Sequence, residues 1–480
     1  MDPAERRSIA TQAAVGLASF LTPFVYGALS VAMPTIGRAF DFSPREMTTV
    51  LMVHLLLSTS CNLPFGRLSD RIGRKRVFMA GSLLFALSSV LAGLAGTPWL
   101  LVAARALQGV GDAMTFGVSA AILVSVVPPE RIGRALGMNI TFVYAGLALG
   151  PLVGGVLTAY LSWRVIFFLS SASGVAALAL VQRNYHEVAG HRDFGEGVTG
   201  LEETGQGKPG LKSAGLDLPG MALYLPAVLT LILGVSLQPS FSGAGLLILS
   251  APLFWALYRA EVRLKRPLLD VVYLCGNRRF GLANLTSTLG YAAGFSTGFL
   301  VSLLLQGVMG LSASHAGYVV LVQPLIMTLA SPLAGWLSDR FHPGRVSAAG
   351  LAVLGLAMFA LSGLGPGVSL ARTSELLAAS GFGFALFVSP NIHAIMRSAD
   401  ASHMGMASGL LATMRGLGMC LSLSVTGIVL ALFAGQPAVA RIGADILPAL
   451  RLCFVLSGLI GLAAAWVSWR GAGTVRHADR

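Results

Sequence analysis

The chain has 480 residues, of which 55% are hydrophobic and only 11% are charged, and its mean hydropathy is +0.76. A soluble domain carries about 25% charged residues. This composition therefore excludes a soluble globular protein and predicts an all-α protein that crosses a membrane many times. The net charge of +13 would suggest nucleic acid as the partner of a soluble protein. In a membrane protein, basic residues instead collect in cytoplasmic loops, so we expect the lipid bilayer as a partner and no nucleic acid.

Hydropathy predicts fourteen membrane spans in three groups. Residues 1–181 form an N-terminal six-helix bundle, with spans at Ile9–Met33, Met47–Pro64, Val77–Ala95, Trp99–Val127, Ile132–Ala159 and Trp163–Val181. Residues 182–279 contain a polar loop (Gln182–Gly215), two inserted spans (Leu216–Leu237 and the short Ala244–Tyr258) and a basic connector (Arg259–Arg279). Residues 280–480 form a C-terminal six-helix bundle and a short cytoplasmic tail, with spans at Phe280–Val308, Ala316–Leu337, Val346–Leu364, Leu370–Ile392, Met404–Phe433 and Ile446–Trp469.

The stretch from Phe280 to Ser338 contains no charged residue. It is too long for one span, so we expect it to turn back near Gly310–Ser314. Lysine and arginine are concentrated in alternate loops, which places both termini in the cytoplasm and the protein in the plasma membrane, expected to be a bacterial inner membrane. No cleavable signal peptide is evident. The four cysteines show no CxxC spacing, so no disulfide and no metal site are expected.

Two short charged stretches repeat each other between apolar segments. Gly66–Arg76 reads GRLSDRIGRKR and Gly335–Arg345 reads GWLSDRFHPGR. The two stretches carry the same residue at six equivalent positions: Gly66 and Gly335, Leu68 and Leu337, Ser69 and Ser338, Asp70 and Asp339, Arg71 and Arg340, and Arg76 and Arg345. This repetition predicts a duplicated bundle in which each half carries an equivalent hinge loop.

Polar residues in the fourth span follow helical periodicity. Arg105, Gln108, Asp112, Thr115 and Ser119 are spaced three, four, three and four, which places all five on one face of a helix. Asp112 would lie near mid-depth. Burial and a nearby arginine act in opposite directions on the charge of such a carboxylate, a combination that suits a group that loads and releases a proton. The alternative is a fixed polar clasp in which Asp112 and Arg105 hold two helices together.

Other polar residues within spans are candidates for a central cavity. His54 and Ser58 share a face of the second span, and Asn284 and Tyr291 lie in the ninth. Arg415 is the only charged residue from Met404 to Phe433, so it balances a carboxylate, attracts an anionic substrate or pairs helices. For His54, a packing role competes with proton relay.

Glycines in the fifth span form the most specific pattern in the chain. Gly137, Gly146, Gly150, Pro151, Gly154 and Gly155 combine small residues at i, i+4 and i+8, which allow close helix packing, with a proline that bends the helix.

Over nearly its whole length, the chain resembles the major facilitator superfamily, and specifically its fourteen-helix drug:proton antiporter branch. The resemblance is carried by the hinge loop Gly66–Arg76, by LVAARALQGVGDA at Leu101–Ala113, by the Gly137–Gly155 motif, by WRVIFF at Trp163–Phe168 and by LQGVMGLSASHAG at Leu305–Gly317.

The resemblance implies roles for these motifs. It implies that Arg105 takes part in proton coupling and that the Gly137–Gly155 motif is associated with export and with closing leaks. It also implies a charged latch on the cytoplasmic side, made by Gly66, Asp70, Arg71, Gly73 and Arg74, with Asp339 and Arg340 in the second copy.

Two departures from that branch bear on function. The branch usually has an acid in the first span where this chain has Val25, and a small residue in the fourth span where this chain has Asp112. The proton site is therefore expected at Asp112, with Arg105 tuning it, in a monomeric transporter without a cofactor that exports amphipathic organic compounds.

Two other functions stay open. The first is a carrier of organic anions or metabolites, with Arg415 as the anion contact. The second is a membrane sensor or scaffold built on a transporter fold, against which the two hinges and the glycine motif argue. An enzyme is not expected, because no nucleotide loop, metal cluster or nucleophile constellation is found.

Overall fold

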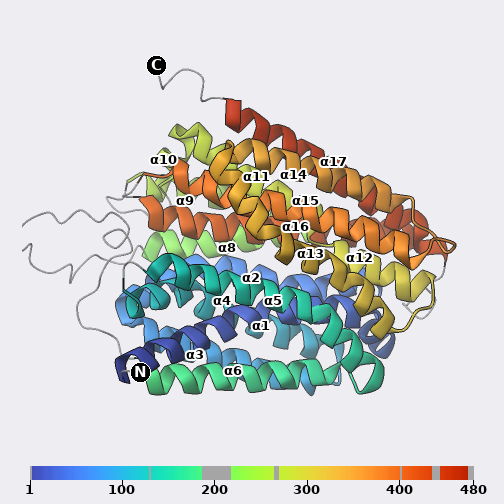
Figure 1. Cartoon of the computed structure of the whole chain (residues 1–480), viewed down its shortest axis with the longest axis horizontal. Helices are drawn as coiled ribbons and strands as arrows, with labels where there is room; N and C mark the ends of the chain where they lie inside the picture. Colours follow the sequence, from blue (N-terminus) through green and yellow to red (C-terminus); the bar gives the residue numbers. More distant parts are fainter. Residues whose placement is uncertain are drawn as a thin grey trace, which may run out of the picture.

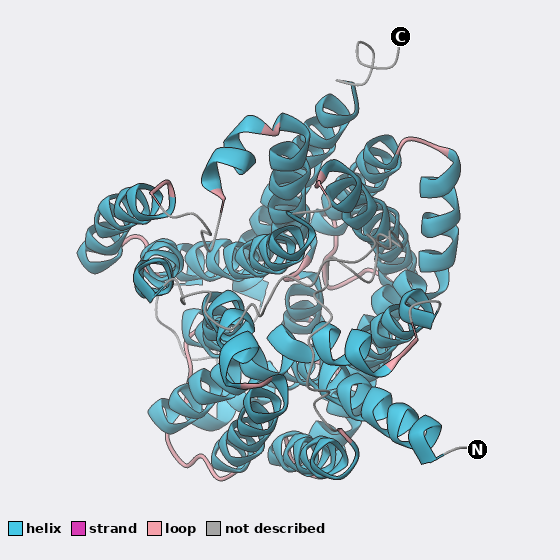
Figure 2. Ribbon diagram, turned by 90° about the vertical axis from the view of Figure 1, so that its left-hand side faces the viewer, coloured by secondary structure: helices cyan, strands magenta, loops and turns pink. Residues whose placement is uncertain are grey.

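A computed structural model describes residues 3–128, 131–185, 218–263, 270–400, 403–434 and 444–473 of the protein. All regular structure in these ranges is helical, and no strand occurs in them. The axes of the long helices are roughly aligned, so that most of these helices are seen end-on in Figure 2.

The N-terminal half is a bundle of six long helices, which form the lower part of Figure 1. They are α1 (Pro3–Phe40), α2 (Pro44–Ile72), α3 (Arg74–Gly93), α4 (Pro98–Val126), α5 (Ile132–Tyr160) and α6 (Arg164–Asn184). The start of α2 shows how local sequence fixes these boundaries. Ser43 Oγ accepts the Glu46 amide N–H at 3.3 Å, and Glu46 Oε2 accepts the Ser43 N–H at 2.7 Å, a capping box that satisfies free amides at the helix start.

The C-terminal half occupies the upper part of Figure 1. Its elements are α11 (Arg278–Gly294), α12 (Thr297–Leu303), the π-helix η2 (Leu304–Val308), α13 (Ala313–Arg340), α14 (Pro343–Ser362), α15 (Leu370–Ser398), α16 (Met404–Ala434), the 3₁₀ turn η5 (Ala444–Ile446) and α17 (Leu447–Gly473).

Between the halves in sequence are α8 (Leu218–Ser236), α9 (Phe241–Glu261) and the short α10 (Val271–Gly276). Helix α8 packs against both α2 and α16, and α9 packs on α8. The inserted pair therefore lies beside one seam between the halves.

Hydropathy predicted the spans well. Thirteen helices in the described ranges are long and apolar enough to cross a membrane, and the predicted span at Leu216–Leu237 is a shorter apolar helix over Gly220–Ser236. The span predicted to be short at Ala244–Tyr258 is the longer α9. The basic connector contains α10, which the sequence did not predict. Most of the predicted polar loop Gln182–Gly215 lies outside the described residues.

The predicted ninth span, Phe280–Val308, is confirmed as a membrane span over Arg278–Val308, but its helix is interrupted. It breaks between Gly294 and Thr297, and the freed amide of Ser296 donates to Ser422 Oγ of α16 at 3.1 Å. A break inside a membrane is tolerated only where a neighbour satisfies the freed backbone group. The turn predicted at Gly310–Ser314 is confirmed: Gly310 has a φ of +68°, which glycine adopts at no steric cost.

Candidate functional site

A cavity of about 190 Å³ lies between the two halves. Its wall combines apolar and aromatic side chains with hydroxyl, amide and charged groups. It is contributed by α1, α2, α4 and α5 on one side and by α11, α13, α15 and α16 on the other. Small-molecule sites commonly measure about 300–1,000 Å³. The cavity is therefore smaller than this range.

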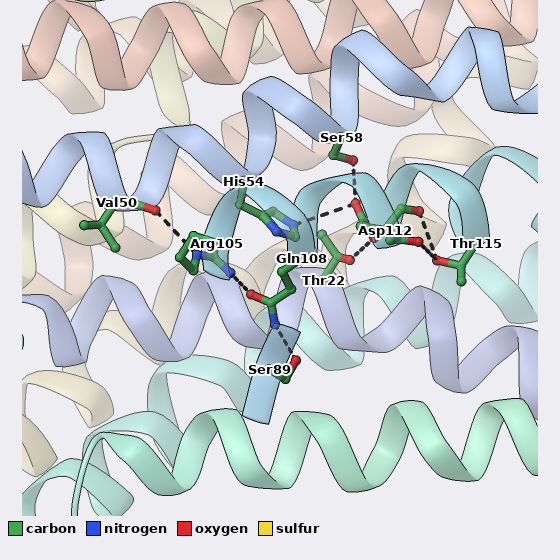
Figure 3. A network of polar contacts seen from close by, with 10 residues as sticks. Thr22, Val50, His54, Ser58, Ser89, Arg105, Gln108, Asp112 and Thr115 are labelled. Atoms are coloured by element: carbon green, nitrogen blue, oxygen red, sulfur yellow. Dashed lines mark hydrogen bonds and ion pairs between the residues drawn. The ribbon is translucent and has the colours of Figure 1, made fainter. Parts of the chain in front are cut away.

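Asp112 is the acid at this cavity, and three side chains from other helices surround its carboxylate (Figure 3). Thr22 of α1 donates a hydrogen bond to Oδ1, and Ser58 of α2 donates to Oδ2 at 2.5 Å. His54 Nε2 of α2 lies 3.7 Å from Oδ2. The residue is 4% exposed, so the hydroxyls of α1 and α2 replace water as hydrogen-bond donors to its carboxylate.

Arg105 belongs to a separate network within the N-terminal half (Figure 3). It is fully buried; its Nε donates to the Val50 carbonyl at 3.4 Å and its Nη1 donates to Gln108 Oε1. Gln108 Nε2 in turn donates to Ser89 Oγ of α3 at 2.7 Å. Arg105 thus joins α4 to α2 directly and to α3 through Gln108. Asp112 has His54 rather than Arg105 as its nearest basic neighbour, so a direct Arg105–Asp112 clasp is not formed.

The opposite wall of the cavity carries the cation Arg415, on α16. Its guanidinium carbon lies 5.2 Å from the ring centroid of Phe116, on α4 of the other half. Tyr291 of α11 lines the same wall, with its ring edge-on to Phe384 and Phe387 at centroid distances of 5.3 and 5.6 Å. One acid and one cation therefore face a shared aromatic cavity from different halves.

The halves are closed together at the end of the bundle away from the hinge loops. Tyr26 of α1 stacks on Phe295 at 4.1 Å between ring centroids, and its hydroxyl donates to the Phe295 carbonyl at 3.2 Å. Farther along α1, the Val31 carbonyl accepts from Gln306 Nε2 at 2.8 Å. These contacts join the first span to the broken ninth span.

Four of the predicted cavity and proton-coupling residues line this cavity, namely Ser58, Asp112, Tyr291 and Arg415. His54 and Gln108 do not line it and require correction: His54 of α2 faces Asp112 of α4, and Gln108 lies between Arg105 and Ser89 of α3. Asn284 also requires correction: it faces a different, apolar cavity between α8, α11 and α16.

Sequence reasoning missed the face of α1 that lines the cavity. Thr22, Tyr26 and Ser30 all line it, and their i, i+4, i+8 spacing is the signal that could have found them. Val25, at the position where the related branch has an acid, is buried in the core.

The glycine motif forms two contacts. A Cβ at Gly146, Gly150 or Gly154 would lie 2.3–2.6 Å from atoms of α1, whereas a Cβ at Gly155 would lie 2.6 Å from the Ala313 carbonyl of α13 and 3.2 Å from Gly317 Cα. Pro151 lines the cavity. Gly137 is an exception to the packing expectation, because a Cβ there would meet nothing within 4 Å.

The first hinge loop turns at Gly73, whose φ of 103° lies in the region that favours glycine. Asp70 pairs with Arg74 at 3.3 Å in the same hinge, and Arg71 is exposed.

In the second hinge, the guanidinium carbon of Arg340 lies 4.2 Å from the centroid of the Trp336 ring. Gly66 contacts α4, where its Cβ would lie 3.7 Å from the Gly117 carbonyl. A latch between the halves stays a prediction.

Comparison with known protein families identifies the family to which the chain belongs. The profile of the Major Facilitator Superfamily matches residues 15–423. The chain belongs to this superfamily. Among superfamily relatives, it is 30% identical over 426 residues to the cephamycin export protein CmcT of Amycolatopsis lactamdurans, covering 85% of this chain and 83% of that protein. It is 27% identical to the riboflavin transporter RibZ of Clostridioides difficile, covering 82% of each chain.

Solved structures of other transporters share the fold. A bacterial homologue of the lysosomal transporter Spinster, in an inward-facing conformation, matches with a TM-score of 0.67 at 17% identity, covering 97% of this chain and 96% of that one. A D-xylose–proton symporter matches with a TM-score of 0.64 at 14% identity, covering 96% and 97%. Because the chain belongs to the Major Facilitator Superfamily, it is a membrane transporter with a small-molecule substrate.

Proposed function

We propose that this transporter exports amphipathic organic compounds in exchange for protons, with Asp112 as the proton carrier and no bound cofactor. One observation carries the proposal: Asp112 faces the inter-half cavity while hydroxyls from two other helices bind its carboxylate. An acid placed there can change both the charge of the cavity and the packing of three helices when it takes up a proton.

The hydrogen bonds at Asp112 suggest how protonation acts. A charged carboxylate accepts from Thr22 and Ser58 together. A protonated carboxyl is itself a donor and loses acceptor capacity, so one of the two hydroxyls must reorient. Protonation also removes the attraction between Asp112 and Arg415 across the cavity. The loss of this attraction would loosen the contact between the halves, whereas the reoriented hydroxyl would change the packing of α1 or α2 on α4 within the N-terminal half. Together these changes would favour the rocking motion by which such transporters alternate access.

The cavity wall supports an amphipathic, flat substrate. Aromatic rings from both halves offer stacking surfaces, while Asp112 and Arg415 provide polar ends. The names of superfamily relatives include an export protein, a riboflavin transporter and Multidrug resistance protein 3 of Bacillus subtilis, the last at 24% identity over 76% of this chain and 68% of that protein. These names favour an organic compound as the substrate.

Transport in sealed vesicles tests the proposal. With purified protein in liposomes and an imposed pH gradient, uptake of ethidium, riboflavin and fluorescein is compared for the native chain, Asp112→Asn and the control Glu375→Gln. Glu375 is exposed and pairs with Arg372 at 3.1 Å, so this control also converts an acid to its amide. We expect Asp112→Asn to abolish gradient-driven transport, with substrate binding retained. Undiminished transport by Asp112→Asn would refute the assignment.

A second candidate is a carrier of organic anions, favoured by the position of Arg415 in the cavity wall. In the same assay, Arg415→Lys would then weaken fluorescein transport more than ethidium transport, because lysine keeps the charge but loses the planar guanidinium. Transport of ethidium alone would rule this candidate out.

A further inference from the structure

A second cavity, of about 500 Å³, lies in the C-terminal half at the end that carries the hinge loops. It is enclosed by the start of α11, the end of α13, the start of α14 and the ends of α15 and α17. It shares no lining residue with the inter-half cavity. Because these helices end here, the cavity lies at the level where a bilayer presents its headgroups.

The side chains that line this cavity carry a net positive charge. Arg279, Arg340 and Arg397 line it from three helices, against the single acid Asp339, so three positive charges less one negative charge give a net charge of +2. Three guanidinium groups in one recess match a ligand that offers several anionic oxygens.

His342 adds a neutral hydrogen-bond donor to the wall. It precedes α14, and its Nδ1 accepts the Gly344 amide N–H at 3.2 Å, so the neutral ring carries its proton on Nε2. Burial, followed by the charges of Arg345, Arg397 and Arg279, lowers the pKa of His342 below its ordinary value. This agrees with the neutral form that the hydrogen bond requires.

Hydrogen bonds between helices hold the cavity walls in place. Ser468 Oγ of α17 donates to the Gly344 carbonyl at 2.8 Å, joining α17 to α14. Ser338 Oγ of α13 lies 3.1 Å from His393 Nδ1 of α15. The recess is therefore built between connected helices.

The first hinge uses its basic residues differently. Arg74 pairs with Asp70, and Lys75 donates to the backbone carbonyls of Gln182 and Tyr185 at 3.0 and 2.6 Å. His342 stands where the first copy has Gly73. In the second copy, by contrast, His342, Asp339 and Arg340 line the second cavity.

We propose that this cavity binds a phosphate group, presented either by an anionic phospholipid headgroup or by a soluble phosphate compound. Arg279 and Arg397 bind its oxygens from opposite helices, and His342 Nε2–H donates a further hydrogen bond. The site is independent of the transported substrate and of Asp112.

Native mass spectrometry of the purified full chain tests the site. Titrations with phosphatidylglycerol, phosphatidylcholine and pyrophosphate compare the native chain with Arg279→Gln/Arg397→Gln and with the matched double control Arg259→Gln/Arg372→Gln. Arg259 lies over the Trp255 ring at 4.4 Å, and Arg372 is exposed; both are outside the cavity. We expect the cavity variant to lose about 10- to 30-fold in affinity for phosphatidylglycerol or pyrophosphate, and the control to lose less than about threefold.

The outcomes separate the two sources of phosphate. Saturable phosphatidylglycerol binding that pyrophosphate does not displace identifies a lipid site, and displacement identifies a site for soluble phosphate. Arg279→Lys/Arg397→Lys keeps both charges and should bind with intermediate affinity, which guards against a folding defect. Equal losses in the cavity and control variants, or no saturable binding of any probe, would overturn the proposal.

Discussion

At the scale of single residues, the fourth span separates two functions along one polar face. Asp112 contacts the inter-half cavity, whereas Arg105, two turns away, is enclosed by α2 and α3. Periodicity predicted that both would share a buried face, and they do. It could not predict which part of that face meets the cavity, because this depends on where α2 crosses α4.

Arg105 should therefore be a strong contributor to stability. Arg105→Lys leaves one nitrogen to replace the contacts with Val50 and Gln108, and lysine cannot reproduce the guanidinium fork. We expect the free energy of unfolding to fall by about 1.5–3 kcal/mol, measured by denaturant unfolding in detergent.

The matched control for that measurement is Arg372→Lys, at an exposed arginine whose partner is Glu375. It should change the free energy of unfolding by less than about 0.5 kcal/mol. Equal effects of the two substitutions would show that the Arg105 network contributes nothing particular to stability.

At the scale of elements, the inserted α8 links the two halves at their seam. Arg45 of α2 donates to the Ser236 carbonyl at 3.2 Å, and the hydroxyls of Tyr224 and Thr413 of α16 lie 3.0 Å apart. Since Thr413 Oγ already donates to the Gly409 carbonyl, Tyr224 is the donor in that pair. Helix α8 is thus attached to both bundles.

Removing the Tyr224 hydroxyl should measure the attachment of α8 to α16. We expect Tyr224→Phe to lower the free energy of unfolding by about 0.5–1.5 kcal/mol, with little further loss when Thr413→Val is added. Tyr258→Phe, at an exposed position of α9, is the control and should be neutral. Fully additive effects of Tyr224→Phe and Thr413→Val in a double-mutant cycle would contradict the contact.

The elements also show where sequence reasoning stops. Runs of apolar residues fixed the number of spans closely, because each must cross the bilayer. The break after Gly294 was not predicted, because the stretch contains no charged residue or proline and its serines, threonines and glycines are also common inside membrane helices. The group that satisfies the freed amide of Ser296 is Ser422, 126 residues away, and only tertiary packing brings it there.

At the scale of the whole molecule, adjacent glycines of α5 belong to different interfaces. Gly154 faces Ala28 of α1 in its own half, whereas Gly155 faces Ala313 and Gly317 of α13 in the other half. The repeated glycine motif predicted close packing, but not that one face serves the bundle and the next serves the contact between halves. Which helix each glycine contacts depends on the side of α5 on which it lies and on how the neighbouring helices pack around α5.

Gly155→Ala should push the halves apart at the end away from the hinges. The added Cβ would lie 2.6 Å from the Ala313 carbonyl, and overpacking of this kind costs about 1–3 kcal/mol, which shifts a two-state equilibrium by about 5- to 150-fold. Spin labels at Tyr160→Cys and Tyr318→Cys, both exposed positions at that end, should report a larger long-distance population. Gly154→Ala should lower the free energy of unfolding without this shift, because its clash lies within one half. If Gly155→Ala left the distance distribution unchanged and only lowered stability, the α5–α13 contact would be part of a rigid core. The two halves would then have to separate along another seam.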